Sequence, residues 1–152
     1  ALGLLCLLGD LLKAGLPVYL ARRFCGMEHP LFALVMAAPV LGHAFSPFLG
    51  GRGGKAIAPA FGVLAALLPA DLSVGVLAVA FLFFSLVVVI TPNRLRTIAA
   101  FTILVIYSIL VNQHGSVALG CTLLSATVIL KHWRPLPQEA PGISFFGRHN
   151  PA

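Results

Sequence analysis

The stretch GHAFSPFLGGRGGK, residues 42–55, lies between two long apolar runs, and the rest of the chain is arranged around it. It holds four glycines within residues 50–54, together with two cations. Glycine allows positive φ and a close approach of backbone to ligand, and successive N–H groups in such a turn bind anions. An apolar helix expected to begin near Ala56 adds the positive end of its dipole. Residues 49–55 therefore predict a loop that binds phosphate or carboxylate at a membrane surface, through Gly51, Arg52, Gly53, Gly54 and Lys55.

The loop differs from two common phosphate-binding motifs. A Walker A loop has Gly where this chain has Leu49, and Ser or Thr where it has Ala56. A dinucleotide fingerprint needs a surrounding βαβ unit, which the flanking apolar runs do not supply. The other interpretation of the loop is a flexible cytoplasmic connection whose two cations only fix the membrane topology.

The composition indicates an integral membrane protein. Of the 152 residues, 59% are hydrophobic and 9% are charged, and the mean hydropathy is +1.01. Soluble domains carry about 25% charged residues. The net charge of +6 comes from cations that flank apolar runs, without the interleaved aromatic residues of a nucleic-acid site. Membrane topology and anionic headgroups therefore explain the charge, and no nucleic-acid partner is expected.

Six apolar runs predict an all-α, polytopic membrane protein with about six hydrophobic helices. The runs cover residues 1–24, 30–48, 56–68, 71–90, 97–111 and 117–130. A polar linker over residues 91–96 separates the fourth run from the fifth. Four prolines follow the last run, so we expect a membrane domain over residues 1–134 and an irregular tail outside the membrane over residues 135–152.

The distribution of cations predicts the orientation of these helices. If the runs alternate in direction, seven Lys and Arg residues lie on the side of the glycine-rich loop and two on the other side, leaving Lys13 aside. The positive-inside rule then places the loop, and the start of the chain, on the cytoplasmic side of the cell membrane.

Two charged residues lie inside the first run. Asp10 and Lys13 are three residues apart, so they share one face of a helix and can form an ion pair. Charges within a span are costly and usually face a polar interior. The pair is therefore either functional or a neutralised pair near the membrane surface. The cysteines and histidines show no disulfide or metal-site spacing, so neither a metal nor a cofactor is expected.

Three motifs in this chain have counterparts in one known family. The loop and its continuation, GHAFSPFLGGRGGKAIA over residues 42–58, resemble the central motif of the PlsY-type bacterial glycerol-3-phosphate acyltransferases, which reads roughly GHxFPxFxxF(K/R)GGKGVAT. The segment from Asp10 to Lys13 resembles the family's D-x-x-K element, and Lys131-His132 resembles the Arg-His pair that ends its final helix. The chain departs from the family pattern at Ser46, Gly51, Ala56 and Pro59 and after His132.

This resemblance implies a seven-helix membrane fold with cytoplasmic motifs. Six of the helices are represented here, and the first helix and first motif are expected upstream of Ala1. The implied reaction moves a fatty acyl group from acyl-phosphate to the 1-hydroxyl of glycerol 3-phosphate. The product is lysophosphatidic acid for phospholipid synthesis. The implied partners are these two substrates and membrane lipids, and the sequence indicates no oligomeric state.

The resemblance also suggests roles for individual residues. His43 and Lys55 are the candidate catalytic residues. His43 either removes the hydroxyl proton or braces the loop. The candidates for holding substrate phosphate are Lys13, Gly51, Arg52, Gly53, Gly54, Lys55 and His132, although His132 is also suited to simple packing at the membrane interface.

Two other functions remain open on the sequence. A catalytically degenerate relative would keep the loop and bind a phosphorylated ligand or a lipid headgroup without turnover. A small transporter or channel subunit would need a polar path through the membrane, and Asp10 and Lys13 are the only charges well inside any run.

Overall fold

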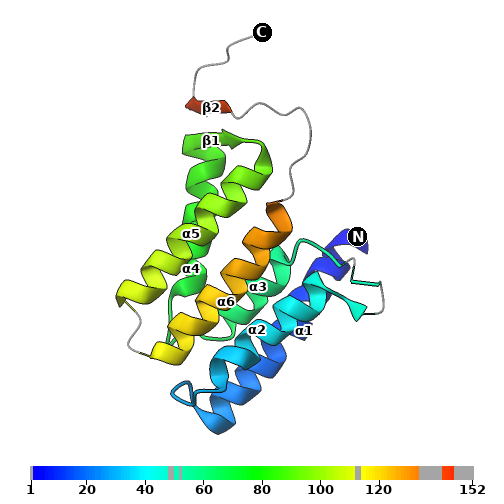
Figure 1. Cartoon of the computed structure of the whole chain (residues 1–152), viewed down its shortest axis with the longest axis vertical. Helices are drawn as coiled ribbons and strands as arrows, with labels where there is room; N and C mark the ends of the chain where they lie inside the picture. Colours follow the sequence, from blue (N-terminus) through cyan, green and yellow to red (C-terminus); the bar gives the residue numbers. More distant parts are fainter. Residues whose placement is uncertain (1, 48–49, 52, 112–113, 134–141, 146–152) are drawn as a thin grey trace.

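The computed structural model describes residues 2–47, 50–51, 53–111, 114–133 and 142–145. Within them the chain forms a bundle of six α-helices (Figure 1). The helices are α1 (Leu2–Cys25), α2 (Phe32–Ala44), α3 (Ile57–Ala65), α4 (Ser73–Leu82), α5 (Asn93–Val111) and α6 (Gly115–His132). A π-helical turn, η2 (Phe83–Val87), and two strands, β1 (Val88–Thr91) and β2 (Gly142–Phe145), complete the described elements. The expected helical architecture is confirmed.

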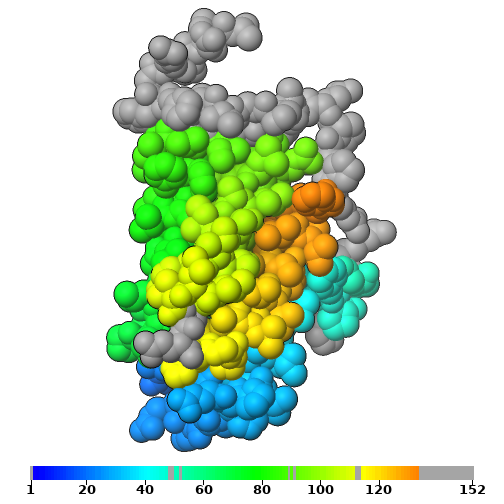
Figure 2. Space-filling view, turned by 60° about the vertical axis from the view of Figure 1, so that its left-hand side comes forward, coloured from blue at the N-terminus to red at the C-terminus, as the bar shows by residue number. Residues whose placement is uncertain are grey.

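The helices pack in pairs that do not follow chain order. α1 packs mainly on α3, and α2 packs mainly on α6. α5 contacts both α4 and α6, and Figure 2 shows these three helices side by side along one face. The largest buried side chains include Phe32 and Met36 of α2, Phe101 of α5 and Leu124 of α6. Val18 of α1, Leu64 of α3 and Leu77 of α4 are also fully buried, so the core extends between all six helices.

Much of the outer surface of the bundle is apolar. In the described part of the chain, α1, α5 and α6 are long and apolar enough to cross a membrane, and α2 and the segment Ser73–Val87 are shorter apolar helices. Large side chains such as Leu2 and Phe24 of α1 and Leu110 of α5 are exposed. Such a surface suits lipid, and the helices satisfy their backbone hydrogen bonds internally, as a membrane span requires.

The backbones of α1 and α3 approach each other closely. A Cβ atom on Gly15 would lie 2.7 Å from the carbonyl oxygen of Gly62, and one on Gly62 would lie 2.3 Å from the carbonyl oxygen of Leu11. Small residues commonly allow membrane helices to pack this tightly. At the other end of the pair, Arg22 donates a hydrogen bond to the carbonyl oxygen of Ala66 at 3.1 Å, just beyond α3. α1 and α3 are thus held together along the length of α3.

The fourth apolar run does not form the single helical span expected over residues 71–90. α4 ends at Leu82, η2 follows, and the chain then enters β1. All four residues from Val87 to Ile90 are β-branched, which favours extended backbone over helix. The prediction of one long helix here is wrong because hydropathy alone does not distinguish an apolar strand from the end of a helix.

Two further expectations about this region are corrected. β2 pairs antiparallel with β1, with Val88 opposite Phe145, so residues 142–145 are not irregular as expected for the tail. The linker expected over residues 91–96 is mostly helical, since α5 begins at Asn93. The Thr97 hydroxyl donates to the carbonyl oxygen of Asn93 at 3.1 Å within this first turn.

Candidate functional site

The glycine-rich loop folds back onto the end of α2. The N–H of Gly51 donates to the carbonyl oxygen of Ser46 at 2.9 Å, and the N–H of Gly54 donates to that of His43 at 3.1 Å. Gly50 and Gly51 have φ of 58° and 78°, values that a side chain disfavours. The described part of the loop is therefore a turn whose backbone is anchored to the last residues of α2 and the two that follow.

Two glycines of the loop lie directly against His43. A Cβ atom on Gly53 would lie 2.0 Å from the carbonyl oxygen of His43. One on Gly54 would lie 2.3 Å from its ring atom Nε2. Both distances are too short for a real contact, so a side chain at Gly53 would overlap backbone and one at Gly54 would displace the His43 ring. His43 is consequently in contact with the loop through both its backbone and its imidazole ring.

α1 brings two charged side chains to the same place. The Lys13 ammonium lies 2.5 Å from Asp10 Oδ1, and His43 Nδ1 lies 3.6 Å from the same oxygen. The Asp10 carboxylate therefore stands between a cation on its own helix and an imidazole on α2. His43 and Asp10 are largely shielded from solvent, with 19% and 29% of their side chains exposed, whereas Lys13 is 56% exposed. Lys13 is thus free to meet a ligand while its charge is partly balanced.

These residues border a cleft of about 460 Å³. The cleft is lined by residues from α1, from the second half of α2 and from the loop: Lys13, Pro39, Gly42, His43, Ser46, Gly53 and Gly54. An ammonium group, a hydroxyl and loop backbone amides next to a partly shielded imidazole form the donor set that a phosphate needs. The cleft therefore has the chemistry of an anion site with an acid or base beside it.

The start of α3 adds further donors near the loop. No backbone carbonyl of the described residues accepts a hydrogen bond from the N–H of Gly53 or Lys55. α3 begins at Ile57 without a side-chain cap, so its first N–H groups also lack helical partners. Ala56, between loop and helix, is buried and has φ of 60°. The backbone here turns sharply from the loop into a helix whose positive end lies at the loop.

The end of α6 also reaches the segment that leads into the loop. Lys131 Nζ lies 4.4 Å from the centre of the Phe45 ring, a cation–π distance. The neighbouring His132 is buried, and its Nδ1 lies 2.7 Å from the carbonyl oxygen of Val128 on the same helix. The central motif over residues 42–58 and the Lys131-His132 motif are therefore in contact, through Phe45 and Lys131.

The structure brings together four of the predicted site residues, since Lys13, His43, Gly53 and Gly54 all line the cleft. Gly51 and Lys55 are exposed on the adjoining loop and His132 is buried in α6, and none of the three is among the described lining residues. Arg52 lies outside the described residues. Sequence reasoning missed the contact of Asp10 with His43 and the place of Ser46 in the lining. The only hint in the sequence that Asp10 belongs to the site was its position three residues before Lys13.

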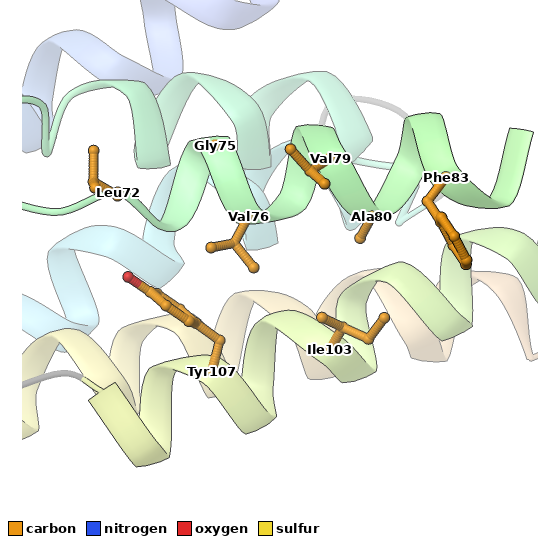
Figure 3. A pocket seen from close by; sticks show the side chains of 8 residues that line it. All are labelled: Leu72, Gly75, Val76, Val79, Ala80, Phe83, Ile103 and Tyr107. Atoms are coloured by element: carbon orange, nitrogen blue, oxygen red, sulfur yellow. The ribbon is translucent and has the colours of Figure 1, made fainter. Parts of the chain in front are cut away.

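A second hollow, of about 610 Å³, lies between α4 and α5 (Figure 3). It is lined by Leu72, Gly75, Val76, Val79, Ala80, Phe83, Ile103 and Tyr107. The Tyr107 hydroxyl is the one polar side-chain group among these residues, and the groove shares no lining residue with the cleft. Its chemistry suits a hydrocarbon chain and not a phosphate.

A sequence profile of the glycerol-3-phosphate acyltransferases matches residues 1–138, which is most of the chain. This chain belongs to the glycerol-3-phosphate acyltransferase family. The glycerol-3-phosphate acyltransferase of Trichlorobacter lovleyi is 38% identical over 130 residues, and that of Geobacter sulfurreducens is 37% identical over 131 residues. Both alignments cover 86% of this chain and 64% of the relative. The resemblance seen in the motifs is confirmed.

Solved structures of the same family have the same fold. A crystal structure of PlsY, an integral membrane glycerol 3-phosphate acyltransferase, in its lysophosphatidic acid form matches with a TM-score of 0.73 at 26% identity, covering 86% of this chain and 65% of PlsY. The glycerol 3-phosphate form of PlsY matches with a TM-score of 0.72, covering 63% of that chain. This acyltransferase-family chain is thus a multi-pass membrane protein that spans a little under two thirds of the length of these relatives.

Proposed function

We propose that this protein transfers a fatty acyl group from acyl-phosphate to the 1-hydroxyl of glycerol 3-phosphate, giving lysophosphatidic acid. The observation that carries the proposal is the cleft in which Lys13, His43 and the Gly53-Gly54 backbone meet. The names of the relatives and the two PlsY forms, one with glycerol 3-phosphate and one with lysophosphatidic acid, support the same substrate and product.

The reaction needs two anions held close together. The hydroxyl oxygen of glycerol 3-phosphate attacks the acyl carbonyl carbon, the bond from that carbon to the phosphate oxygen breaks, and inorganic phosphate leaves. Phosphate is a good leaving group, so no covalent intermediate with the protein is required. Holding donor and acceptor in the correct geometry supplies much of the rate, and donors aimed at the phosphates reduce their mutual repulsion.

We assign the phosphates to Lys13 and to the loop. Lys13 faces the cleft from α1, and the loop offers the N–H groups of Gly53 and Lys55, which donate to no described backbone carbonyl. The N–H groups of Gly51 and Gly54 are bonded to the end of α2 and hold the loop in shape beside the phosphates. Lys55 and Arg52 add the two cations of the loop motif. His132, at the end of α6, is a further candidate for holding substrate phosphate. The acyl chain needs apolar surroundings, which the membrane and the grooves between helices offer.

His43 is the proposed base for the hydroxyl proton. Its Nδ1 faces Asp10, which favours the tautomer with the proton on Nδ1 and leaves Nε2 as the acceptor. Nε2 lies on the side of Gly54, next to the proposed phosphate-binding backbone. The proton thus passes from the hydroxyl to Nε2. Bracing of the loop by His43 is compatible with this role.

We further propose that the protein acts in the cytoplasmic membrane with the cleft open to the cytoplasm. The support is the excess of cations on the side of the loop, which the positive-inside rule places in the cytoplasm.

The direct test is acyl transfer from palmitoyl-phosphate to labelled glycerol 3-phosphate, in membranes that contain the natural chain or a variant. Lys13→Met keeps an unbranched side chain without the charge, and we expect kcat/KM to fall about 10- to 100-fold, as for a lost charge-assisted hydrogen bond. The matched control is Arg23→Met, which removes an exposed cation from the far end of the same helix and should leave kcat/KM unchanged.

The outcomes separate the proposed reaction from simple binding. Product formation that falls in Lys13→Met, but not in Arg23→Met, supports the acyltransferase and the cleft. No transfer by the folded natural chain, together with binding of glycerol 3-phosphate, would instead support a degenerate relative. Equal losses in Lys13→Met and Arg23→Met would contradict the assignment of the site.

A further inference from the structure

We infer that Lys131 is a positioning residue, which holds the glycine-rich loop against the end of α6 through its contact with the Phe45 ring. The inference rests on the proposed function, because the loop it positions is the proposed phosphate site. Lys131 itself is not among the described residues that line the cleft. Its ammonium lies 4.4 Å from the ring centre of Phe45, within the range of a cation–π interaction.

The position of Phe45 in the chain allows its side chain to fix the backbone that holds the loop. Phe45 is the first residue after α2, and its N–H donates to the carbonyl oxygen of Leu41 at 2.8 Å, which ends the helix. On either side of it, His43 and Ser46 accept the hydrogen bonds from Gly54 and Gly51. A side chain that fixes Phe45 therefore fixes the backbone platform on which the described loop is built.

The loop has few other ties to α6. The described hydrogen bonds of the loop run to residues 43–47, and not to α6. In Figures 1 and 2 the orange end of α6 lies beside the cyan segment around the end of α2. The body of α6 is held by its packing on α2, where a Cβ on Gly120 would lie only 2.5 Å from Met36 Sδ. Loss of the Lys131 contact should therefore release the loop without unfolding the bundle.

Charge and ring geometry make the contact testable with conservative variants. Lys131→Arg and Phe45→Tyr each keep a cation over a ring face, whereas Lys131→Gln and Phe45→Leu each remove one partner. For acyl transfer, we expect Lys131→Gln to raise KM for glycerol 3-phosphate about two- to fivefold, as for a partly exposed cation–π contact. The value of kcat should change less than KM, and Lys131→Arg should restore KM.

The increases in KM caused by Lys131→Gln and by Phe45→Leu should not add in the double variant. Lys131→Gln combined with Phe45→Leu should raise KM no further than either change alone, because both remove the same contact. Matched controls come from the far end of α1, where Arg23→Gln and Phe24→Leu remove an exposed cation and an exposed ring. Additive effects, or an unchanged KM in Lys131→Gln, would overturn the inference.

A second measurement keeps the inference separate from the proposed activity. Hydrogen–deuterium exchange on the full chain in detergent should show faster exchange of the Gly51 and Gly54 amides in Lys131→Gln and Phe45→Leu, and natural exchange in Lys131→Arg. Unchanged exchange in Lys131→Gln would reject the positioning role whether or not the protein is active. Absence of transfer by the natural chain, with the exchange pattern as expected, would count against the proposed function alone.

Discussion

At the scale of single residues, the site depends on glycines that are required by space as well as by backbone conformation. Gly53 and Gly54 lie so close to His43 that a side chain on either would overlap it. Gly50 and Gly51 are instead required by their positive φ. Two of the four glycines of the motif are therefore explained by close packing and two by positive φ, a difference that the sequence pattern alone does not show.

Gly54→Ala tests this packing directly. The added methyl group would meet Nε2 of His43 at 2.3 Å, so either the imidazole or the loop must move. We expect acyl transfer to fall about 10- to 100-fold, as for a misplacement of the order of 1 Å at a reacting centre. Gly9→Ala is the matched control, because nothing lies within 4 Å of a Cβ at that position of α1. Retained activity in Gly54→Ala would show that His43 needs no fixed position.

At the scale of elements, the site depends on the close crossing of α1 and α3. α1 supplies Asp10 and Lys13, and α3 begins just after the loop. The contact between Gly62 and the Leu11 backbone brings these two helices together one residue from Asp10. A change in their spacing would therefore move Lys13 relative to the loop amides.

Gly62→Ala should disturb this crossing. The new methyl group would lie 2.3 Å from the carbonyl oxygen of Leu11, and backbone cannot move aside as a flexible side chain can. We expect a loss of about 1–3 kcal/mol in the free energy of unfolding, measured as a lower unfolding midpoint in detergent. Gly75→Ala on α4, where nothing lies within 4 Å of a Cβ, should cause no loss. Equal midpoints for the two variants would contradict the tight crossing.

At the scale of the whole molecule, the arrangement of helices puts the loop at one end of the bundle and the α1–α2 connection at the other (Figure 1). Cys25 is the last residue of α1 and is exposed at the end with the α1–α2 connection. Pro47 follows α2 and is exposed at the end with the glycine-rich loop. These two positions report the orientation of the protein in its membrane.

Thiol labelling of right-side-out membrane vesicles with an impermeant reagent checks the proposed orientation. In a Cys6→Ser and Cys121→Ser background, we expect Cys25 to be labelled from the outside. Pro47→Cys, made with Cys25→Ser as well, should be labelled only after the membrane is permeabilised. The reverse pattern would place the loop outside the cytoplasm, and labelling of both positions from one side would contradict the bundle itself.

The helices and the loop were predictable from sequence because they depend on local composition. Long apolar runs need a membrane and form helices within it, and glycines beside cations favour an anion-binding turn. The exception is the run from Val87 to Ile90, where an apolar strand and an apolar helix have similar hydropathy and pairing with β2 favours the strand.

By itself the sequence determined the membrane class, the six helices and the family, and it predicted that the loop binds an anion. The tertiary structure decided which distant side chains meet. Asp10 contacts His43 because α1 and α2 pack together, and Lys131 reaches Phe45 because α6 packs on α2. These contacts join residues 33 and 86 positions apart in the chain. Local propensity carries no information on such pairs, since packing of whole helices sets the distance between them.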